Sequence, residues 1–269
     1  MADVTFRDIQ KGLQALGLTR DSRLLAVGDL AALGPVRGGA ETVIGALAAG
    51  TALVVAPAFT PQCQVWPLVG PERNGARYAD HAADNAAAEF FRPHTPTTGL
   101  GEALRHAPGA QRSTHPLYSF VAVGADAALT LAAQSLAEPL GPLAHLAQPG
   151  RGGELLLIGA EPSANLARHS AEARAGRKQF IRWALTPGGI VECVACPGCP
   201  DGFHAAAPLV RPLHRVTQIG AARVERLPLA ELIDAAVALL RREPEALLCR
   251  RPGCERCADV RGLLTAQLA

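Results

Sequence analysis

Hydrophobic and polar positions follow two different periods along this chain. In residues 5–18, apolar side chains recur every three or four positions, at Phe6, Ile9, Leu13 and Leu16, which is the spacing of an amphipathic helix. Elsewhere apolar residues run almost without interruption, as they do in buried strands. These runs predict strands at 23–28, 52–60, 120–123 and 153–160.

Helical patterns lie between these runs. They predict helices at 40–50, 99–107, 125–137 and 229–242. Residues 61–97 are expected to form a long polar loop, and residues 243–269 a short, polar, cysteine-rich tail packed onto the rest of the chain.

Antiparallel signals come late in the chain. Residues 178–185 and 188–195 predict a β-hairpin joined at Pro187-Gly188-Gly189, and residues 216–228 predict a further strand region. Alternating strands and helices followed by antiparallel pairs predict a single α/β domain with a mixed central sheet over residues 1–269. The alternative is a second independent domain that begins near residue 185.

Composition narrows the class of protein. The chain has 269 residues, 49% of them hydrophobic, a net charge of +2 and only 4% aromatic residues. Without a basic run interleaved with aromatics, nucleic-acid binding is not expected. The N-terminus carries acids and no long apolar core, and no stretch is long enough to span a membrane, so we expect a cytoplasmic protein.

Six of the seven cysteines fall into two clusters, at Cys193, Cys196 and Cys199, and at Cys249, Cys254 and Cys257. In a reducing compartment such cysteines are free or metal-bound. The C-x-x-C pairs Cys196/Cys199 and Cys254/Cys257 suit a tetrahedral zinc ion that would staple the tail to the body. Disulfides and reduced thiols are the alternatives. Cys63 stands alone, without a neighbour that would mark it as an activated thiol.

A glycine-rich connection leads into the second predicted helix. Gly38 and Gly39 would expose backbone N–H groups at the positive end of the helix dipole, which suits a phosphate. No Lys-Ser/Thr pair follows, and the full dinucleotide fingerprint is missing. The alternative is a flexible strand-to-helix turn.

Two histidines are candidates for acid–base chemistry. Pro116 biases His115 toward an extended conformation at the entry to the strand 120–123, so His115 is either a placed acid or base or an ordinary loop residue. Asn165 is able to cap a helix that begins near Leu166.

The second histidine belongs to that helix. His169 and Glu172 would share one of its faces because they are three residues apart. They are then either a pair that tune each other's proton affinity or part of a solvated helix face.

Three segments together resemble one family. They are "LGPVRGGAETVIGALAAGTALVVAPAFT" (33–60), "EALRHAPGAQRSTHPLYSFVAVG" (102–124) and "GGELLLIGAEPSANLARHSAE" (152–172). Their order and spacing are similar to those of the aminoglycoside 3-N-acetyltransferase family, the antibiotic acetyltransferases outside the GNAT fold. The most specific element is R-S-x-H-P-x-x-S, and the resemblance covers roughly residues 5 to 260.

The resemblance implies a single α/β/α domain and an acetyl-CoA-dependent N-acetyltransferase that confers antibiotic resistance. The acceptor would be an amine on the 2-deoxystreptamine ring of an aminoglycoside, and a homodimer is left open. By resemblance, CoA would lie against Leu33, Val36, Gly38, Gly39, Ala40, Arg112 and Ser113. The resemblance also implies that the reacting groups lie beside His115, Ser119, His169 and Glu172.

The chemistry implied for these residues is aminolysis of a thioester. A base with a pKa near neutrality must take a proton from the amine, and either His115 or His169 would serve. Glu172 would attract the substrate ammonium, and Ser119 or backbone N–H groups would stabilise the oxyanion.

The chain departs from the family at the end of its first strand. A His-Ser-Ser element is usual there, and this chain has Val27-Gly28-Asp29. Asp29 brings a negative charge toward an anionic cofactor. Two other functions are therefore kept open: acyl transfer to a non-antibiotic amine, and a binding protein that has lost CoA. An acidic cleft for a polycationic substrate would draw on acids of the long loop such as Asp80, Asp84 and Glu89.

Overall fold

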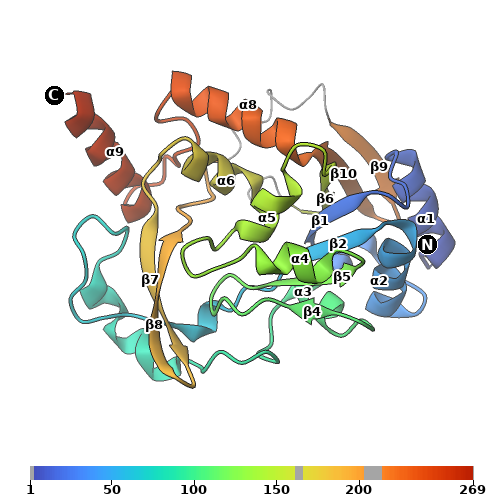
Figure 1. Cartoon of the computed structure of the whole chain (residues 1–269), viewed down its shortest axis with the longest axis horizontal. Coiled ribbons are helices and arrows are strands. Elements are labelled where there is room, and N and C mark those ends of the chain that lie inside the picture. Colours follow the sequence, from blue (N-terminus) through green and yellow to red (C-terminus); the bar gives the residue numbers. More distant parts are fainter. Residues whose placement is uncertain (1–2, 161–165, 203–213, 269) are drawn as a thin grey trace.

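The computed structural model describes residues 3–160, 166–202 and 214–268. Its centre is a seven-stranded mixed sheet between two layers of helices (Figure 1). This agrees with the predicted α/β class and mixed central sheet. The sheet has the strand order β4 (Gln111–Arg112), β5 (Phe120–Gly124), β2 (Leu53–Pro57), β1 (Arg23–Gly28), β6 (Gly153–Ile158), β10 (Ala222–Pro228) and β9 (Arg215–Ile219).

The three central strands are parallel, and antiparallel strands extend the sheet on both sides. β1 pairs in parallel with β2 and β6, while β5 and β10 join antiparallel outside them. Neighbouring residues along β1 belong to different cores: Leu24 packs with one and Leu25 with the other, and neither is exposed. Burial on both faces is the reason that these strands are continuous apolar runs in the sequence.

Each face of the sheet has its own layer of helices. One core contains side chains of α1 (Phe6–Ala15), α2 (Gly39–Gly50) and α3 (Gly99–Arg105). The other contains side chains of α4 (Ala127–Ala132), α5 (Gly141–Leu146), α6 (Ala167–Arg174) and α8 (Leu229–Arg242). The last helix, α9 (Glu255–Leu268), lies at the end of the molecule away from the N-terminus (Figure 1).

The predicted hairpin forms, but it does not join the central sheet. β7 (Phe180–Thr186) and β8 (Gly189–Cys196) pair antiparallel, and β3 (Gln64–Val65) adds to β7 in a separate three-stranded sheet. The chain then returns to the central sheet with β9 and β10, and β10 pairs with both β9 and β6. The strands after residue 185 are therefore divided between the two sheets: β8 belongs to the small sheet, and β9 and β10 belong to the central one.

The predicted polar loop at 61–97 contains organised structure. Besides β3 it holds two 3-10 helices, η2 (Pro61–Cys63) and η3 (Tyr78–Ala87). The Trp66 ring stacks on His81 with 4.0 Å between centroids, and the Asn85 amide bonds both the N–H and the C=O of Trp66. These side-chain hydrogen bonds stabilise turns whose residues show no hydrophobic periodicity. The periodicity of the sequence therefore did not predict this structure.

Two helix boundaries also differ from the predictions. α4 ends at Ala132, five residues early, because Gln134 turns to donate its amide to the carbonyls of Tyr118 and Pro139. The predicted cap Asn165 lies outside the described residues, and α6 begins at Ala167. Within the described ranges, no helix is long and apolar enough to cross a membrane.

Gly101 allows α3 to approach the end of β2. A Cβ at this position would lie 2.0 Å from the carbonyl oxygen of Pro57. We expect Gly101→Ala to lower the free energy of unfolding by about 1–3 kcal/mol, because the backbones must separate. The control is Gly262→Ala in α9, where no atom lies within 4 Å of an added Cβ. Urea unfolding measures both, and equal stability of the two variants would contradict the close approach.

Candidate functional site

The carboxyl ends of the parallel strands meet at one edge of the sheet, where open α/β sheets bind ligands. A cavity of about 290 Å³ lies there. Val27 and Gly28 of β1 and Pro57 of β2 line it, together with residues 97–101 before and within α3. The residues at 97–101 carry no motif and were not predicted as site residues.

At the end of β1, where the family usually has His-Ser-Ser, the close approach of β6 explains why this chain has a glycine at position 28. Its φ is +155°, and a Cβ there would lie 2.1 Å from the carbonyl oxygen of Ile158 on β6. Only glycine fits this approach, so no side chain projects from this position. Asp29 is exposed, and its Oδ1 accepts a hydrogen bond from the N–H of Ala31 at 2.9 Å, which starts the 3-10 helix η1 (Leu30–Leu33).

His169 and Glu172 are brought together on α6 as their spacing predicted. Nδ1 of His169 lies 2.8 Å from Oε2 of Glu172, and the two residues are 4% and 3% exposed. An ionised carboxylate only accepts hydrogen bonds, so Nδ1 carries the proton and the lone pair of the neutral ring is on Nε2. The solvated-face alternative is therefore wrong.

Arg177 completes this pair and was not singled out in the sequence. Its Nη1 donates to Oε1 of Glu172 at 2.6 Å, so that both carboxylate oxygens have a partner. Its Nη2 donates to the carbonyl oxygens of Pro244 at 2.5 Å and Ala246 at 2.7 Å. The arginine thus ties the His169–Glu172 pair to the start of the C-terminal tail.

A second cavity, of about 370 Å³, lies beside the pair. His169 and Ser170 of α6 form part of its wall, together with Ala144 of α5 and residues of α8. Its acidic residues are Glu138 and Asp234, and Asp234 is paired with Arg174 at 2.9 Å. A mixed apolar and acidic wall beside a histidine suits an amine-bearing ligand.

His115 is buried in a different arrangement. Its Nδ1 accepts hydrogen bonds from the backbone N–H groups of Leu117 at 3.2 Å and Tyr118 at 3.1 Å. Nε2 therefore carries the proton of the neutral ring, and burial lowers the pKa of His115 to about 4. A ring whose lone pair is used by two N–H groups is a hydrogen-bond donor, so this geometry argues against His115 as the base.

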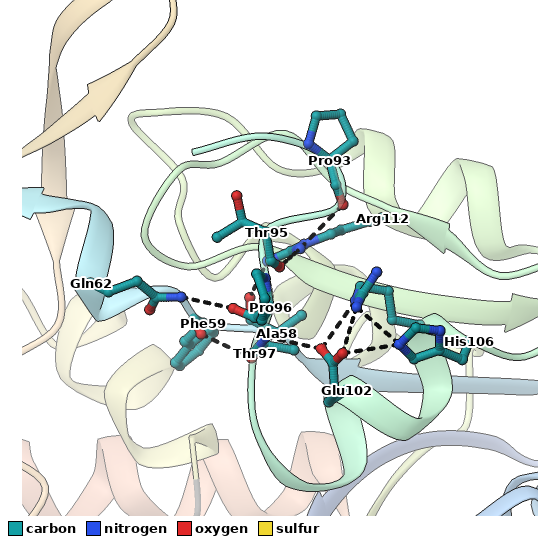
Figure 2. A network of polar contacts seen from close by, with 11 residues as sticks. Ala58, Phe59, Gln62, Pro93, Thr95, Pro96, Thr97, Glu102, His106 and Arg112 are labelled. Atoms are coloured by element: carbon teal, nitrogen blue, oxygen red, sulfur yellow. Dashed lines mark hydrogen bonds and ion pairs between the residues drawn. The ribbon is translucent and has the colours of Figure 1, made fainter. Parts of the chain in front are cut away.

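Arg112 is used to hold loops together (Figure 2). Its guanidinium donates to the carbonyl oxygens of Ala58 at 2.9 Å, Thr95 at 2.5 Å and Pro93 at 3.2 Å, and Nε donates to Ser119 Oγ at 3.0 Å. Desolvation of the buried guanidinium lowers the pKa of Arg112. These contacts bind the segment 93–95 to the end of β2 and do not point to a phosphate contact.

The two predicted serines have backbone partners. Ser119 is fully buried, and its hydroxyl donates to the carbonyl oxygen of Ala58 at 2.7 Å, so it has no proton left for an oxyanion. Ser113 Oγ accepts from the N–H of Phe120 at 2.8 Å and donates to its carbonyl oxygen. The R-S-x-H-P-x-x-S segment is thus held in place mainly by hydrogen bonds to the backbone.

Glu102 fixes the turn that lines the first cavity (Figure 2). It accepts from Arg105 at 2.5 Å, from the N–H of Thr97 at 2.9 Å and from His106 at 3.0 Å. The Arg105 hydrogen bond is the main reason that the pKa of Glu102 falls to about 2. A charged carboxylate therefore holds residues 97–101 in place.

The predicted cofactor residues at 33–40 lie away from these walls. Leu33 is 2% exposed in the core, and Val36 forms a parallel bridge with Val4. Gly38, Gly39 and Ala40 are exposed at the start of α2. Of the described residues lining the two cavities, none comes from 33–40.

The four cysteines that lie close together are not the four that the sequence predicted as zinc ligands. The sulfur atoms of Cys199, Cys249, Cys254 and Cys257 lie within 4.8 Å of one another. Burial raises the pKa of Cys254, but hydrogen bonds from the Cys257 backbone and neighbouring thiols outweigh it and lower the pKa to about 7.

Cys196 is not in this group, so its predicted place in the set is wrong. It ends β8 and packs into a small core with Cys63 and Cys193. Burial raises the pKa of Cys196 to about 12 and also raises that of Cys63, which does not suit a catalytic thiol.

Comparison with known proteins agrees with this architecture. Residues 26–241 match the family model of aminoglycoside 3-N-acetyltransferases. The chain is 32% identical over 234 residues to an aminoglycoside N(3)-acetyltransferase III from Salmonella sp., covering 76% of this chain and 79% of that one.

Solved structures share the fold. The apoenzyme of aminoglycoside acetyltransferase AAC(3)-IVa superposes with a TM-score of 0.78 at 22% identity, over 97% of this chain and 98% of that one. AAC-IIIb in a binary complex with CoASH gives a TM-score of 0.71 at 23% identity, over 90% and 97%. By the extent of the family match and the identity to its relatives, this chain belongs to the aminoglycoside 3-N-acetyltransferase family.

Proposed function

We propose that this protein transfers the acetyl group of acetyl-CoA to an amine of an aminoglycoside, with His169 as the general base. The observation that carries the proposal is the buried hydrogen-bonded set Arg177–Glu172–His169, whose histidine lines a cavity that also contains Glu138. A relative named for aminoglycoside N(3)-acetylation and a neighbour that holds CoASH support the two substrates.

The proposed step is direct aminolysis. The neutral amine attacks the thioester carbonyl, and the ammonium proton passes to Nε2 of His169. The C–S bond then breaks, and the CoA thiolate takes up the proton, which returns His169 to its neutral form. Glu172 accepts from Nδ1 and stabilises the imidazolium, and Arg177 orients the carboxylate by donating to its other oxygen. No covalent enzyme intermediate is needed.

Each substrate is assigned to one of the two cavities. The cavity at the ends of β1 and β2 suits the thioester, because ligands of open α/β sheets bind there. The cavity beside His169 suits the acceptor, since the Glu138 carboxylate in its wall attracts an ammonium group, whereas Asp234 is paired with Arg174. Asp29 is exposed and acidic near the first cavity, so we expect it to weaken CoA binding.

We infer that zinc has no part in this reaction. Four cysteine ligands fill every position of a tetrahedral ion and leave none open for substrate. We also infer that the protein acts in the cytoplasm, because none of its seven cysteines is in a disulfide and unoxidised cysteines persist in a reducing compartment.

Mass spectrometry tests the transfer. We expect wild type, incubated with acetyl-CoA and a panel of 2-deoxystreptamine aminoglycosides, to add one acetyl group to its substrate. His169→Gln should lower kcat by about 10²- to 10⁴-fold because the base is lost. His115→Asn is the matched control and should retain activity. If no aminoglycoside of the panel is acetylated, other amines are tested as acceptors and CoA binding is measured by calorimetry. The absence of binding heat with CoA would favour a binding protein without acetyltransferase activity.

Arg177 is proposed as a positioning residue. Arg177→Met should lower kcat and move the acidic limb of the kcat/KM profile to higher pH, because a positive charge near the His169–Glu172 pair is removed. Arg177→Lys should restore part of both effects. Arg20→Met, at an exposed position, is the control. A fall in kcat without a shifted limb would assign Arg177 a purely structural role.

His115 is expected to make stability depend on pH. The unfolded imidazole binds a proton below about pH 6.5, and the folded one only below about pH 4. The unfolded chain therefore holds more protons in this window, and stability is lost as the pH falls through it, by about 3 kcal/mol at most.

Urea unfolding at several pH values measures this effect. In His115→Asn the amide oxygen can accept the same backbone N–H groups without titrating. We expect a flatter pH dependence for this variant. Identical slopes for both proteins would show that His115 is not the titrating group.

A further inference from the structure

We propose that Cys199, Cys249, Cys254 and Cys257 bind one zinc ion and thereby fasten the C-terminal segment to the body of the protein. The four sulfur atoms come from two distant parts of the chain and lie within 4.8 Å of one another. In a tetrahedral zinc–thiolate site with 2.3 Å bonds, sulfur atoms are about 3.8 Å apart. The cluster is thus close to the required geometry.

The cluster is shielded from solvent. Cys199, Cys249 and Cys257 are 6%, 4% and 1% exposed, and Cys254 is half-buried. Ordinary core packing would place aliphatic side chains here, whereas these four cysteines form a cluster of their own with Leu248. Four thiols brought together in one buried place are the donor set that zinc prefers.

The backbone around the cluster suits thiolates. The N–H of Cys249 donates to Sγ of Cys257 at 3.4 Å. Gly253, with a φ of +74°, turns the chain so that Cys254 precedes α9 and Cys257 lies on its first turn. Residues 249–257 therefore curl around one point, as a zinc-binding loop does.

Local charge favours the site as well. Zinc with four thiolates carries two negative charges, which need positive neighbours. The segment 249–261 has more basic than acidic residues: Arg250, Arg251, Arg256 and Arg261 against Glu255 and Asp259. Arg251 also pairs with Asp201 at 2.8 Å, and Arg261 donates to the carbonyl oxygen of Cys249 at 2.5 Å.

The site would act on the proposed catalytic pair through the tail. Cys199 follows β8, and the other three cysteines belong to the tail, so one ion joins both. The carbonyl oxygens of Pro244 and Ala246, which accept from Arg177, lie a few residues before Cys249. This last step rests on the proposed function, whereas zinc binding does not.

Metal analysis of the purified full chain tests the site. We expect close to one zinc per chain in the wild type, and loss of most of it in Cys199→Ser and Cys249→Ser. Cys196→Ala is the matched control and should keep the metal, because Cys196 belongs to the other cysteine group. Circular dichroism shows that each variant is folded. Retention of zinc by Cys249→Ser, or its loss from folded Cys196→Ala, would overturn the proposed ligand set.

The wild type provides a second readout that needs no variant. Titration with an organomercurial should release the zinc as about four thiols react, and Co²⁺ exchange should give the visible spectrum of a tetrahedral thiolate site. Iron in place of zinc, two disulfides, or free thiols without metal would each overturn the proposal. None of these readouts depends on acetyl transfer, so they separate this proposal from the proposed function.

Discussion

The pairing of β1 between β2 and β6 is the constraint on which the rest of the structure depends. All three strands are parallel and buried on both faces, so their carboxyl ends meet at one edge of the sheet. The start of α3 lies beside the ends of β1 and β2 at this edge. Gly28 and Gly101 are required because backbones approach too closely for a Cβ. The first cavity is therefore a consequence of how the parallel strands are paired.

The polar residues near this edge have two roles. Arg112, Ser119 and Ser113 bond to backbone carbonyls and N–H groups, and they hold irregular segments in which no regular ladder exists. Nδ1 of His115 does the same by accepting hydrogen bonds from two backbone N–H groups. Most of the hydrogen-bonding capacity of these residues goes to the backbone, and the exception is Nε2 of His115, which is buried without a hydrogen-bond partner among the described residues.

The Glu172 carboxylate connects the remaining parts. It joins His169 on α6 with Arg177, and Arg177 reaches two carbonyl oxygens of the tail. A buried charge is stable only when it is paired, so this arrangement needs the tail in place. The four-cysteine cluster follows directly on the same segment, so the proposed zinc ion would help to hold the tail in place.

The sequence by itself determined most of the strands and helices, the late hairpin and the sharing of a helix face by His169 and Glu172, because these depend on local spacing. Tertiary structure alone decided the rest. It placed β7 and β8 in a second sheet with β3, made Arg177 the partner of Glu172, and replaced Cys196 with Cys249 in the cysteine group. Each of these contacts joins residues whose distance in space is set by the folding of the whole chain, and no local period encodes that distance.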